Sequence, residues 1–155
     1  MEPTESLTNF LELSYEDLEV LNLKARAITS PQKAESQHIK YLTDEKHIKA
    51  VTVCFSDIEG RLHMLDYDKK FFLGSLDNLT FDGSSIRGLS ELHESDLRLK
   101  VDWTSLTFVP ADVFGAGKII VFANVCDREM KPYNSDFRGT AVNKLTWADR
   151  NQVFA

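Results

Sequence analysis

The chain has 155 residues, of which 18 are Lys or Arg and 24 are Asp or Glu, so its formal net charge is −6 at pH 7. Its 43% hydrophobic and 27% charged residues are typical of a folded globular protein and exclude a chain that is disordered throughout. The acidic balance argues against non-specific binding to nucleic acid or to an anionic membrane. The longest unbroken apolar run, residues 119–123, is far shorter than the about 20 residues that a membrane span needs.

The amino-terminal sequence and the cysteines indicate a cytoplasmic protein. The first residues, MEPTE, are acidic and contain no apolar stretch of the kind found in secretory signals. Two cysteines, Cys54 and Cys126, are too few for a disulfide framework. Both lie inside apolar strand patterns, so we expect them to be small buried groups.

Residues 1–48 are predicted to form an N-terminal helical segment. Ser14 is a typical helix N-cap, and Asp17 three positions later can complete a capping box. Pro31 is tolerated in a first helical turn, so Ser30-Pro31 ends one helix or begins a second. Apolar residues of the first helix recur on one stripe at helical spacing, namely Leu18, Leu21, Ala25 and Ile28.

The hydrophobic pattern then changes to a period of two, which is typical of strands. Residues 51–55 alternate in this way, residues 57–60 (Asp-Ile-Glu-Gly) have turn chemistry, and residues 61–65 are predicted to pair back as a hairpin. Asp68 can cap a short helix over residues 69–73.

Three further strands are predicted at residues 97–101, 106–109 and 119–125, and the last, being the most apolar, is expected in the centre of the sheet. Several strands with one short helix between them predict an α+β domain in which a mixed sheet packs on that helix. Six residues are expected to supply much of the core: Val51, Val53, Phe55, Ile120, Phe122 and Val125.

The segment 81–88, Phe-Asp-Gly-Ser-Ser-Ile-Arg-Gly, is the strongest candidate for a functional site, and two interpretations are open. It can be a solvated connecting loop or tight turn. Alternatively, Gly83 and Gly88 support a loop that displays the carboxylate of Asp82 and the hydroxyl groups of Ser84 and Ser85. A carboxylate beside two hydroxyls suits a cation such as ammonium, which has only hydrogen-bond donors and therefore needs acceptors.

The sequence contains neither a complete phosphate-binding loop pattern nor a typical metal-binding pattern. Gly83–Gly88 and the segment Gly115-Ala116-Gly117-Lys118 each lack part of the phosphate-loop pattern, and both are predicted to be turns. No metal site is expected, because the four histidines show neither i, i+4 pairing nor a cysteine at zinc spacing; they are His38, His47, His63 and His93.

The hexapeptide Phe81–Ile86, followed by Glu94-Ser95-Asp96, resembles the amino-terminal β-grasp domain of glutamine synthetase. The resemblance continues upstream in the strand and Glu59-Gly60 turn, and downstream in residues 118–126 and the pattern Tyr133-x-x-Asp136-x-Arg138. It implies a β-grasp-like fold and three regions: helices at 1–48, the β-grasp domain at 49–139 and an unassigned tail at 140–155.

The resemblance also implies a reaction. Glutamine synthetases join ammonia to glutamate with ATP and Mg²⁺ or Mn²⁺, in oligomers whose β-grasp domain lends its aspartate loop to a neighbouring subunit. By this resemblance Asp82 binds ammonium and accepts its proton, Ser85 lies beside it, and Gly83, Ser84 and Gly88 support the loop. The family's metal, ATP and glutamate ligands lie in a larger carboxy-terminal domain, so we expect this chain alone to bind no cofactor and to be inactive. The alternative is a stand-alone β-grasp module that associates with or modulates full-length glutamine synthetase.

Overall fold

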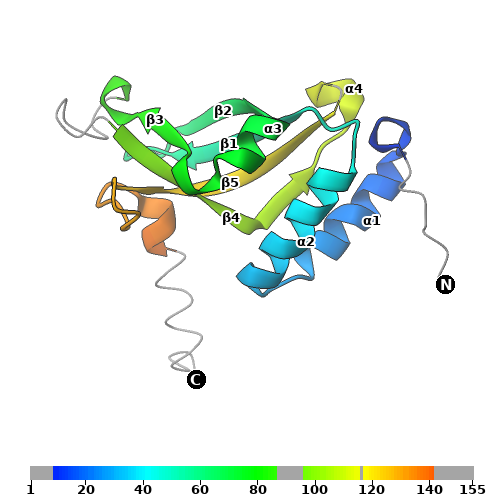
Figure 1. Cartoon of the computed structure of the whole chain (residues 1–155), viewed down its shortest axis with the longest axis horizontal. Helices are drawn as coiled ribbons and strands as arrows, with labels where there is room; N and C mark the ends of the chain where they lie inside the picture. The colour runs from blue at the N-terminus through cyan, green and yellow to red at the C-terminus, as the bar shows by residue number, and fades with distance from the viewer. Residues whose placement is uncertain (1–8, 87–95, 116, 142–155) are drawn as a thin grey trace. The chain divides into compact units, whose positions relative to one another are not determined.

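The computed structural model describes residues 9–86, 96–115 and 117–141, and its order of helices and strands confirms the expected α+β class (Figure 1). Within the described residues, five strands form one sheet in the order β2-β1-β5-β4-β3, so the predicted central strand is confirmed. No described helix is long and apolar enough to cross a membrane. The strands are β1 (Ala50–Ser56), β2 (Leu62–Asp68), β3 (Thr80–Asp82), β4 (Asp96–Phe108) and β5 (Lys118–Cys126).

The chain divides into two compact units, which we describe separately. The first unit consists of Met1–Val53, Asp66–Gly74 and Asp102–Phe122. The second consists of Cys54–Leu65, Ser75–Val101 and Ala123–Ala155. The strands β1, β2, β4 and β5 each have residues in both units, so the division falls within strands and not at linkers.

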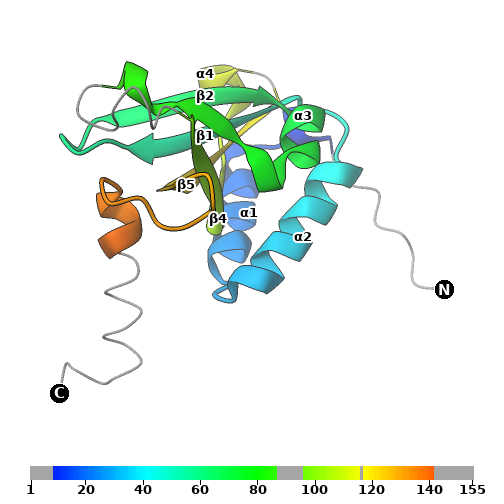
Figure 2. The ribbon, with the colours of Figure 1, turned by 60° about the vertical axis from the view of Figure 1, so that its left-hand side comes forward.

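In the first unit, the predicted helices are α1 (Tyr15–Arg26) and α2 (Pro31–Asp44), which lie side by side (Figures 1 and 2). Ser14 and Asp17 form both hydrogen bonds of the capping box before α1, and Pro31 occupies the first turn of α2. Asn22 joins α1 to the sheet, because its side chain donates to the carbonyl of Phe108 at 2.9 Å and accepts from the N–H of Phe108 at 2.8 Å. Helix α1 is therefore hydrogen-bonded to the last residue of β4.

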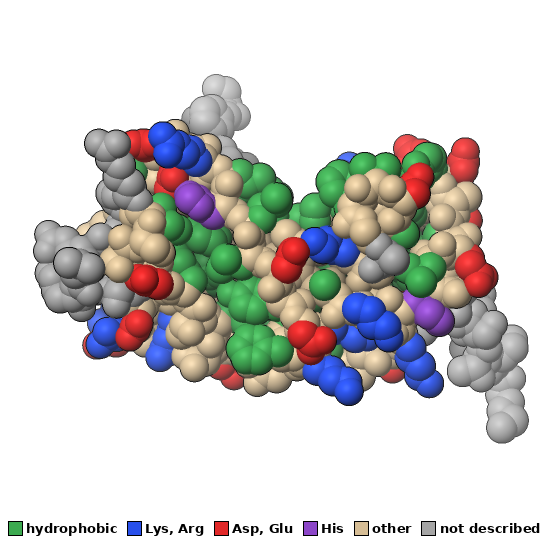
Figure 3. Space-filling view, turned by 90° about the horizontal axis from the view of Figure 1, so that it is seen from above, with side chains coloured by type: hydrophobic (Ala, Val, Ile, Leu, Met, Phe, Trp, Pro, Cys, Tyr) green, Lys and Arg blue, Asp and Glu red, His purple; other side chains and the backbone are tan. Residues whose placement is uncertain are grey.

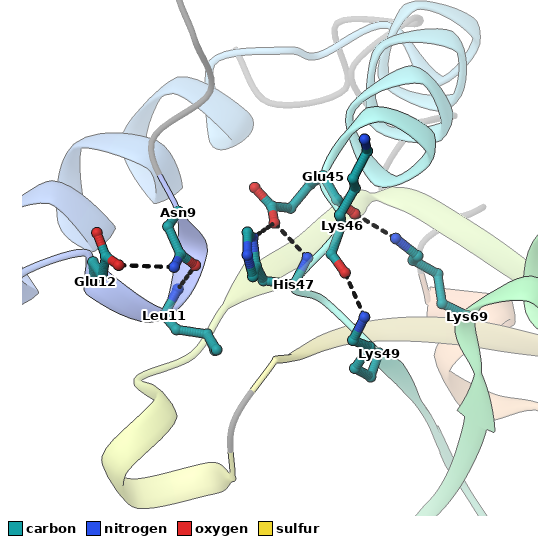
Figure 4. Close-up of polar contacts among 8 residues, drawn as sticks. All are labelled: Asn9, Leu11, Glu12, Glu45, Lys46, His47, Lys49 and Lys69. Carbon is teal, nitrogen blue, oxygen red and sulfur yellow. Dashed lines mark hydrogen bonds and ion pairs between the residues drawn. The ribbon is translucent and has the colours of Figure 1, made fainter.

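A polar cluster that the sequence did not reveal connects α2 to β1 (Figure 4). The carboxylate of Glu45, only 2% exposed, accepts from the N–H of His47 at 2.7 Å and contacts the His47 ring Nδ1 at 3.0 Å. The ammonium groups of Lys69 and Lys49 donate to the carbonyls of Glu45 and Lys46. Lys69 thus satisfies the carbonyl of Glu45, which the end of α2 leaves without an intrahelical donor.

The short helix α3 (Lys69–Gly74) packs on the sheet through Phe72, which is fully buried. The Phe72 ring contacts Trp103 of β4 at a centroid distance of 5.8 Å and Tyr67 of β2 at 6.4 Å. As predicted, Asp68 caps the helix by accepting from the N–H groups of Lys70 and Phe71. The predicted packing of the sheet on this helix is confirmed.

The face of β5 that is buried differs from the expectation. Ile119 and Val121 are fully buried, whereas Ile120 and Phe122, which were expected in the core, are only half-buried. The expected core positions Val51, Val53, Phe55 and Val125 are confirmed. Every residue from 119 to 123 is apolar, so the local pattern carries no information about which face is covered.

The two strands predicted at 97–101 and 106–109 are one continuous strand, β4, of 13 residues. The polar residues between them interrupted the apolar alternation in the sequence. Trp103 lies in that stretch and is 6% exposed, because it packs on Phe72. A tertiary contact therefore continues the strand where the sequence pattern stops.

In the second unit, two turns of the same construction follow β1 and β5. In each, an aspartate Oδ1 accepts from the backbone N–H groups of the second and fourth residues after it, at 2.8–2.9 Å. The third residue after the aspartate has a left-handed backbone conformation: Gly60 (φ 77°) follows Asp57, and Met130 (φ 62°) follows Asp127. The turn predicted at 57–60 is therefore confirmed, and it has a counterpart after the central strand.

Several large hydrophobic side chains remain exposed, among them Leu23, Met64, Val113 and Phe137. Figure 3 shows hydrophobic side chains gathered in the middle of one face, with acidic and basic side chains around them. Exposed hydrophobic residues are ordinary on a protein surface, and we assign these residues no partner.

Candidate functional site

The loop that carries Asp82 begins where β3 ends. Asp82 is the last residue of β3 and the N-cap of the 3₁₀ turn η3 (Gly83–Ser85). Its Oδ1 atom accepts from the Ser84 N–H at 3.0 Å and from the Ser84 hydroxyl at 2.6 Å. The Ser85 hydroxyl donates to the backbone carbonyl of Asp82 at 2.7 Å. Aspartate favours this position because its short carboxylate reaches N–H groups that have no other partner.

One carboxylate oxygen of Asp82 is therefore fixed, and the other is available. Within the described residues no hydrogen bond reaches Oδ2, and the Asp82 side chain is exposed. The hydroxyl and backbone N–H of Ser84, followed by the backbone N–H of Ser85, lower the pKa of Asp82 below its ordinary value. The group is thus a carboxylate at neutral pH, with one oxygen open to a cation.

The other residues predicted to support the loop differ from one another in burial and in hydrogen bonding. Gly83 is buried, and its φ is not among the positive values of the described glycines. The hydroxyl that contacts the Asp82 carboxylate belongs to Ser84, while that of Ser85 contacts the backbone. Gly88 lies outside the described residues.

A row of side chains supports the loop from the interior of the second unit. Phe81, immediately before Asp82, packs on Phe55 of β1 at a ring-centroid distance of 4.6 Å. The His63 ring stacks on Phe55 at 5.3 Å, and its Nε2 contacts Asp57 Oδ2 at 2.7 Å. Asp57 is 3% exposed and also organises the β1–β2 turn. Sequence reasoning missed this row, because its members are separated by up to 26 residues and meet only in the folded sheet.

The downstream landmarks of the sequence are joined to β5. Asp136, 3% exposed, accepts from the N–H of Val125 at 2.9 Å through Oδ2 and from the N–H of Gly139 at 3.0 Å through Oδ1. Arg138 donates to the Asn124 side chain at 2.6 Å. These two landmark residues thus attach the segment after β5 to the strand itself.

The three histidines that the structure describes either contact a carboxylate or are buried in a helix. His63 and His47 contact Asp57 and Glu45 respectively, and His38 is buried on α2, where burial lowers its pKa. The described residues contain no group of three or more His, Cys, Asp or Glu side chains that could hold a metal ion. Cys54 and Cys126 are buried, as expected. His93 lies outside the described residues.

The glycines before β5 form a turn, as predicted. Gly115 has φ 93° and Gly117 has φ 70°. The carbonyl of Gly117 accepts from the N–H groups of Lys49 and Ala50 at 2.7 and 3.2 Å, which fixes the turn against the start of β1. Lys118, which follows, contacts Asp66 at 2.7 Å. The lysine therefore pairs with a carboxylate of the same unit.

Comparison with known families finds a match over residues 47–128 to the model described as "Glutamine synthetase, beta-Grasp domain". Among curated proteins, the chain is 35% identical over 101 residues to a glutamine synthetase of Thermotoga maritima, covering 64% of this chain and 23% of that protein. It is 34% identical over 114 residues to a glutamine synthetase of Mycobacterium bovis, covering 71% of this chain and 23% of that protein. The chain thus spans about a quarter of the length of these relatives.

Among solved structures, the fold is similar to a glutamine synthetase of Plasmodium falciparum determined by cryo-electron microscopy. The TM-score is 0.65 at 18% sequence identity, covering 75% of this chain and 22% of the other. At this identity the likeness concerns the fold alone, and it agrees with the β-grasp class expected from the sequence.

Proposed function

Because the chain belongs to the glutamine synthetase family through its β-grasp domain, we propose that it is the amino-terminal part of an ATP-dependent glutamate–ammonia ligase of the cytoplasm. In this proposal the Asp82 loop binds ammonium at the active site of a neighbouring subunit. The observation that carries the proposal is the Asp82 carboxylate, exposed at the end of β3 with Oδ1 held by Ser84. A cation-binding group needs this combination of a fixed position and a free acceptor.

The chemistry of the loop is consistent with ammonium as its ligand. Ammonium has four N–H donors and no acceptor, so an ionised carboxylate with a free oxygen is a suitable partner. The lowered pKa of Asp82 keeps the group charged but makes it a weak base. Proton transfer therefore requires that the assembled site lower the pKa of the bound ammonium or raise that of Asp82. Ammonia, once formed, is the nucleophile of the ligase reaction.

The family's ATP and divalent metal require ligands beyond those described here. The described residues do not fit a resident Mg²⁺ or Mn²⁺, because they contain no cluster of three potential ligands. The glycine turn before Lys118 likewise lacks the hydroxyl of a phosphate loop. The proposal therefore assigns to this chain only the binding and orientation of ammonium.

The test is a chimera that joins this β-grasp domain to a complete glutamine synthetase catalytic domain. Asp82→Asn preserves the size of the side chain and removes its charge. We expect kcat/KM for ammonia to fall by about 10²–10⁴-fold, the range typical of a positioned acid–base group. Ser85→Ala should have a milder effect, because one neutral hydrogen bond is worth only about 0.5–1.5 kcal/mol.

The matched control is Asp77→Asn, which removes the charge of an exposed aspartate five residues earlier. We expect this variant to retain the ammonia kinetics of the parent chimera, and the KM for ATP to change little in either variant. Ammonia kinetics near those of the parent in an assembled Asp82→Asn chimera would show that the loop is only a solvated turn.

A further inference from the structure

The antiparallel ladder of β3 and β4 presents a second set of polar groups beside the Asp82 loop. Thr80 pairs with Arg98 and Asp82 pairs with Asp96. Side chains alternate along a strand, so Thr80 and Asp82 lie on one face and Phe81 on the other, where it packs on Phe55. Cross-strand partners share a face, which places Asp96 and Arg98 with Thr80 and Asp82.

This face carries basic groups beside the carboxylates of Asp82 and Asp96, although the chain as a whole has a net charge of −6. Lys100 lies two residues beyond Arg98 on the same strand and therefore on the same face, and Arg128 follows β5, the neighbour of β4. Arg128 pairs with Asp96 at 3.0 Å. In the described part of the chain, neither Arg98 nor Lys100 has an ion-pair partner, so their charges are not neutralised within the fold.

Two of these basic groups, Arg98 and Arg128, line a depression in the surface. A hollow of about 340 Å³ is lined by Thr80, Asp96, Arg98 and Arg128. The hollow is open to solvent and not enclosed. The lining offers two guanidinium groups and one hydroxyl as donors, while Asp96 contributes acceptors that Arg128 already contacts.

We propose that this hollow is a binding site for a phosphate group, either free or as a monoester. Two guanidinium groups and a hydroxyl supply more donors than the two oxygens of a carboxylate can use, whereas a phosphate presents three or four oxygens. Arg98 is half-buried and unpaired among the described residues, so it can bind phosphate without breaking an existing ion pair. Asp96 acts against the ligand, because its carboxylate competes for Arg128 and repels an anion, and the Asp82 carboxylate on the same face adds to the repulsion. This inference does not depend on the proposed ligase function, since Asp82 is not one of its ligands.

The test uses the 155-residue chain and inorganic phosphate, titrated at constant ionic strength and followed by calorimetry and by ¹⁵N–¹H spectra. We expect saturable binding with shifts at Thr80 and Arg98. Arg98→Gln should weaken binding at least about 10-fold, because charge-assisted hydrogen bonds are lost, and Arg98→Lys should restore part of it. Asp96→Asn should strengthen binding, because it removes the competing carboxylate. Acetate at the same ionic strength should bind at least about fivefold more weakly than phosphate, since it uses fewer donors.

The matched control is Arg61→Gln, which removes the same charge from an exposed arginine that pairs with Glu59 at 2.7 Å in the β1–β2 turn. Phosphate affinity should be unchanged in this variant. Three results would each overturn the proposal: no saturation by phosphate, an equal loss of affinity in Arg61→Gln and Arg98→Gln, or equal affinities for acetate and phosphate. None of these results would bear on the proposed role of Asp82, which the ammonia kinetics of the Asp82→Asn chimera test separately.

Discussion

At the scale of single residues, buried carboxylates that accept hydrogen bonds from backbone N–H groups recur in this chain. Asp57 and Asp136 are each 3% exposed, and each accepts from two backbone N–H groups. Asp82, at the surface, accepts from one backbone N–H and one hydroxyl, both of Ser84, and leaves its other oxygen without a partner among the described residues. The same residue type is thus structural where both of its oxygens are bonded and a candidate ligand where one is not.

The first prediction at this scale concerns Gly139. A Cβ atom built on Gly139 would collide with the Asp136 carboxylate, which is held in place by its bonds to Val125 and Gly139. Gly139→Ala should therefore lower the free energy of unfolding by about 1–3 kcal/mol, as overpacking does in other proteins. Urea denaturation measures the difference.

Gly74→Ala is the matched control, because a Cβ at Gly74 would meet no atom within 4 Å and its φ is not positive. It should change the free energy of unfolding by less than about 1 kcal/mol, in the stabilising direction if it changes at all. Equal stabilities of the two variants would show that the Asp136 carboxylate does not hold the segment after β5 tightly against that strand.

At the scale of elements, the central strand provides a test with two neighbouring isoleucines. Ile119 is fully buried and Ile120 is half-buried on the opposite face. Ile119→Ala should lower the free energy of unfolding by about 2–5 kcal/mol, and Ile120→Ala by about half of that or less, because less apolar surface and a smaller cavity are involved. Denaturant titration of the two variants compares them directly, and a larger loss for Ile120→Ala would reverse the orientation of β5.

The β1–β2 turn predicts a pH dependence of stability. The contact with His63, together with the N–H groups of Arg61 and Glu59, lowers the pKa of Asp57 below its ordinary value. The stability that this carboxylate contributes is therefore complete above its unfolded pKa of about 3.9 and is lost as the pH falls through the lower folded pKa. Asp57→Asn should be less stable at pH 7 and should lose less stability than the parent between pH 5 and the acid limit.

Urea denaturation at several pH values measures this effect. The exposed Asp77 provides the control, because Asp77→Asn should follow the pH curve of the parent. Parallel pH curves for Asp57→Asn and the parent would show that the turn does not depend on the charge of Asp57.

At the scale of the whole molecule, our proposal assigns to this chain only part of an active site. The described residues hold no metal-ligand cluster, and the chain spans about a quarter of its curated relatives. We therefore expect the purified chain to form no glutamine from glutamate, ammonia and ATP, in an assay where a full-length glutamine synthetase is active. Steady turnover by the chain that Asp82→Asn abolishes would show that its residues suffice for catalysis.

The sequence by itself determined the features that depend on near neighbours. The capping box of Ser14 and Asp17, the start of α2 at Pro31, the Asp68 cap and the 57–60 turn all join residues no more than four positions apart. The types of residue within a few positions of one another are sufficient to specify such hydrogen bonds. The order of the family landmarks along the chain likewise indicated the β-grasp domain, which the family match confirms.

Only the tertiary structure decided which groups meet across the sheet. The buried face of β5, the continuity of β4 through Trp103, and the row from Asp57 to Phe81 depend on contacts between residues distant in the chain. An apolar segment buries whichever face its neighbours cover. The half-buried Arg98 lines the same hollow as Arg128 only because β4 lies beside β5 in the folded sheet. These outcomes follow from packing and register, which no local pattern contains.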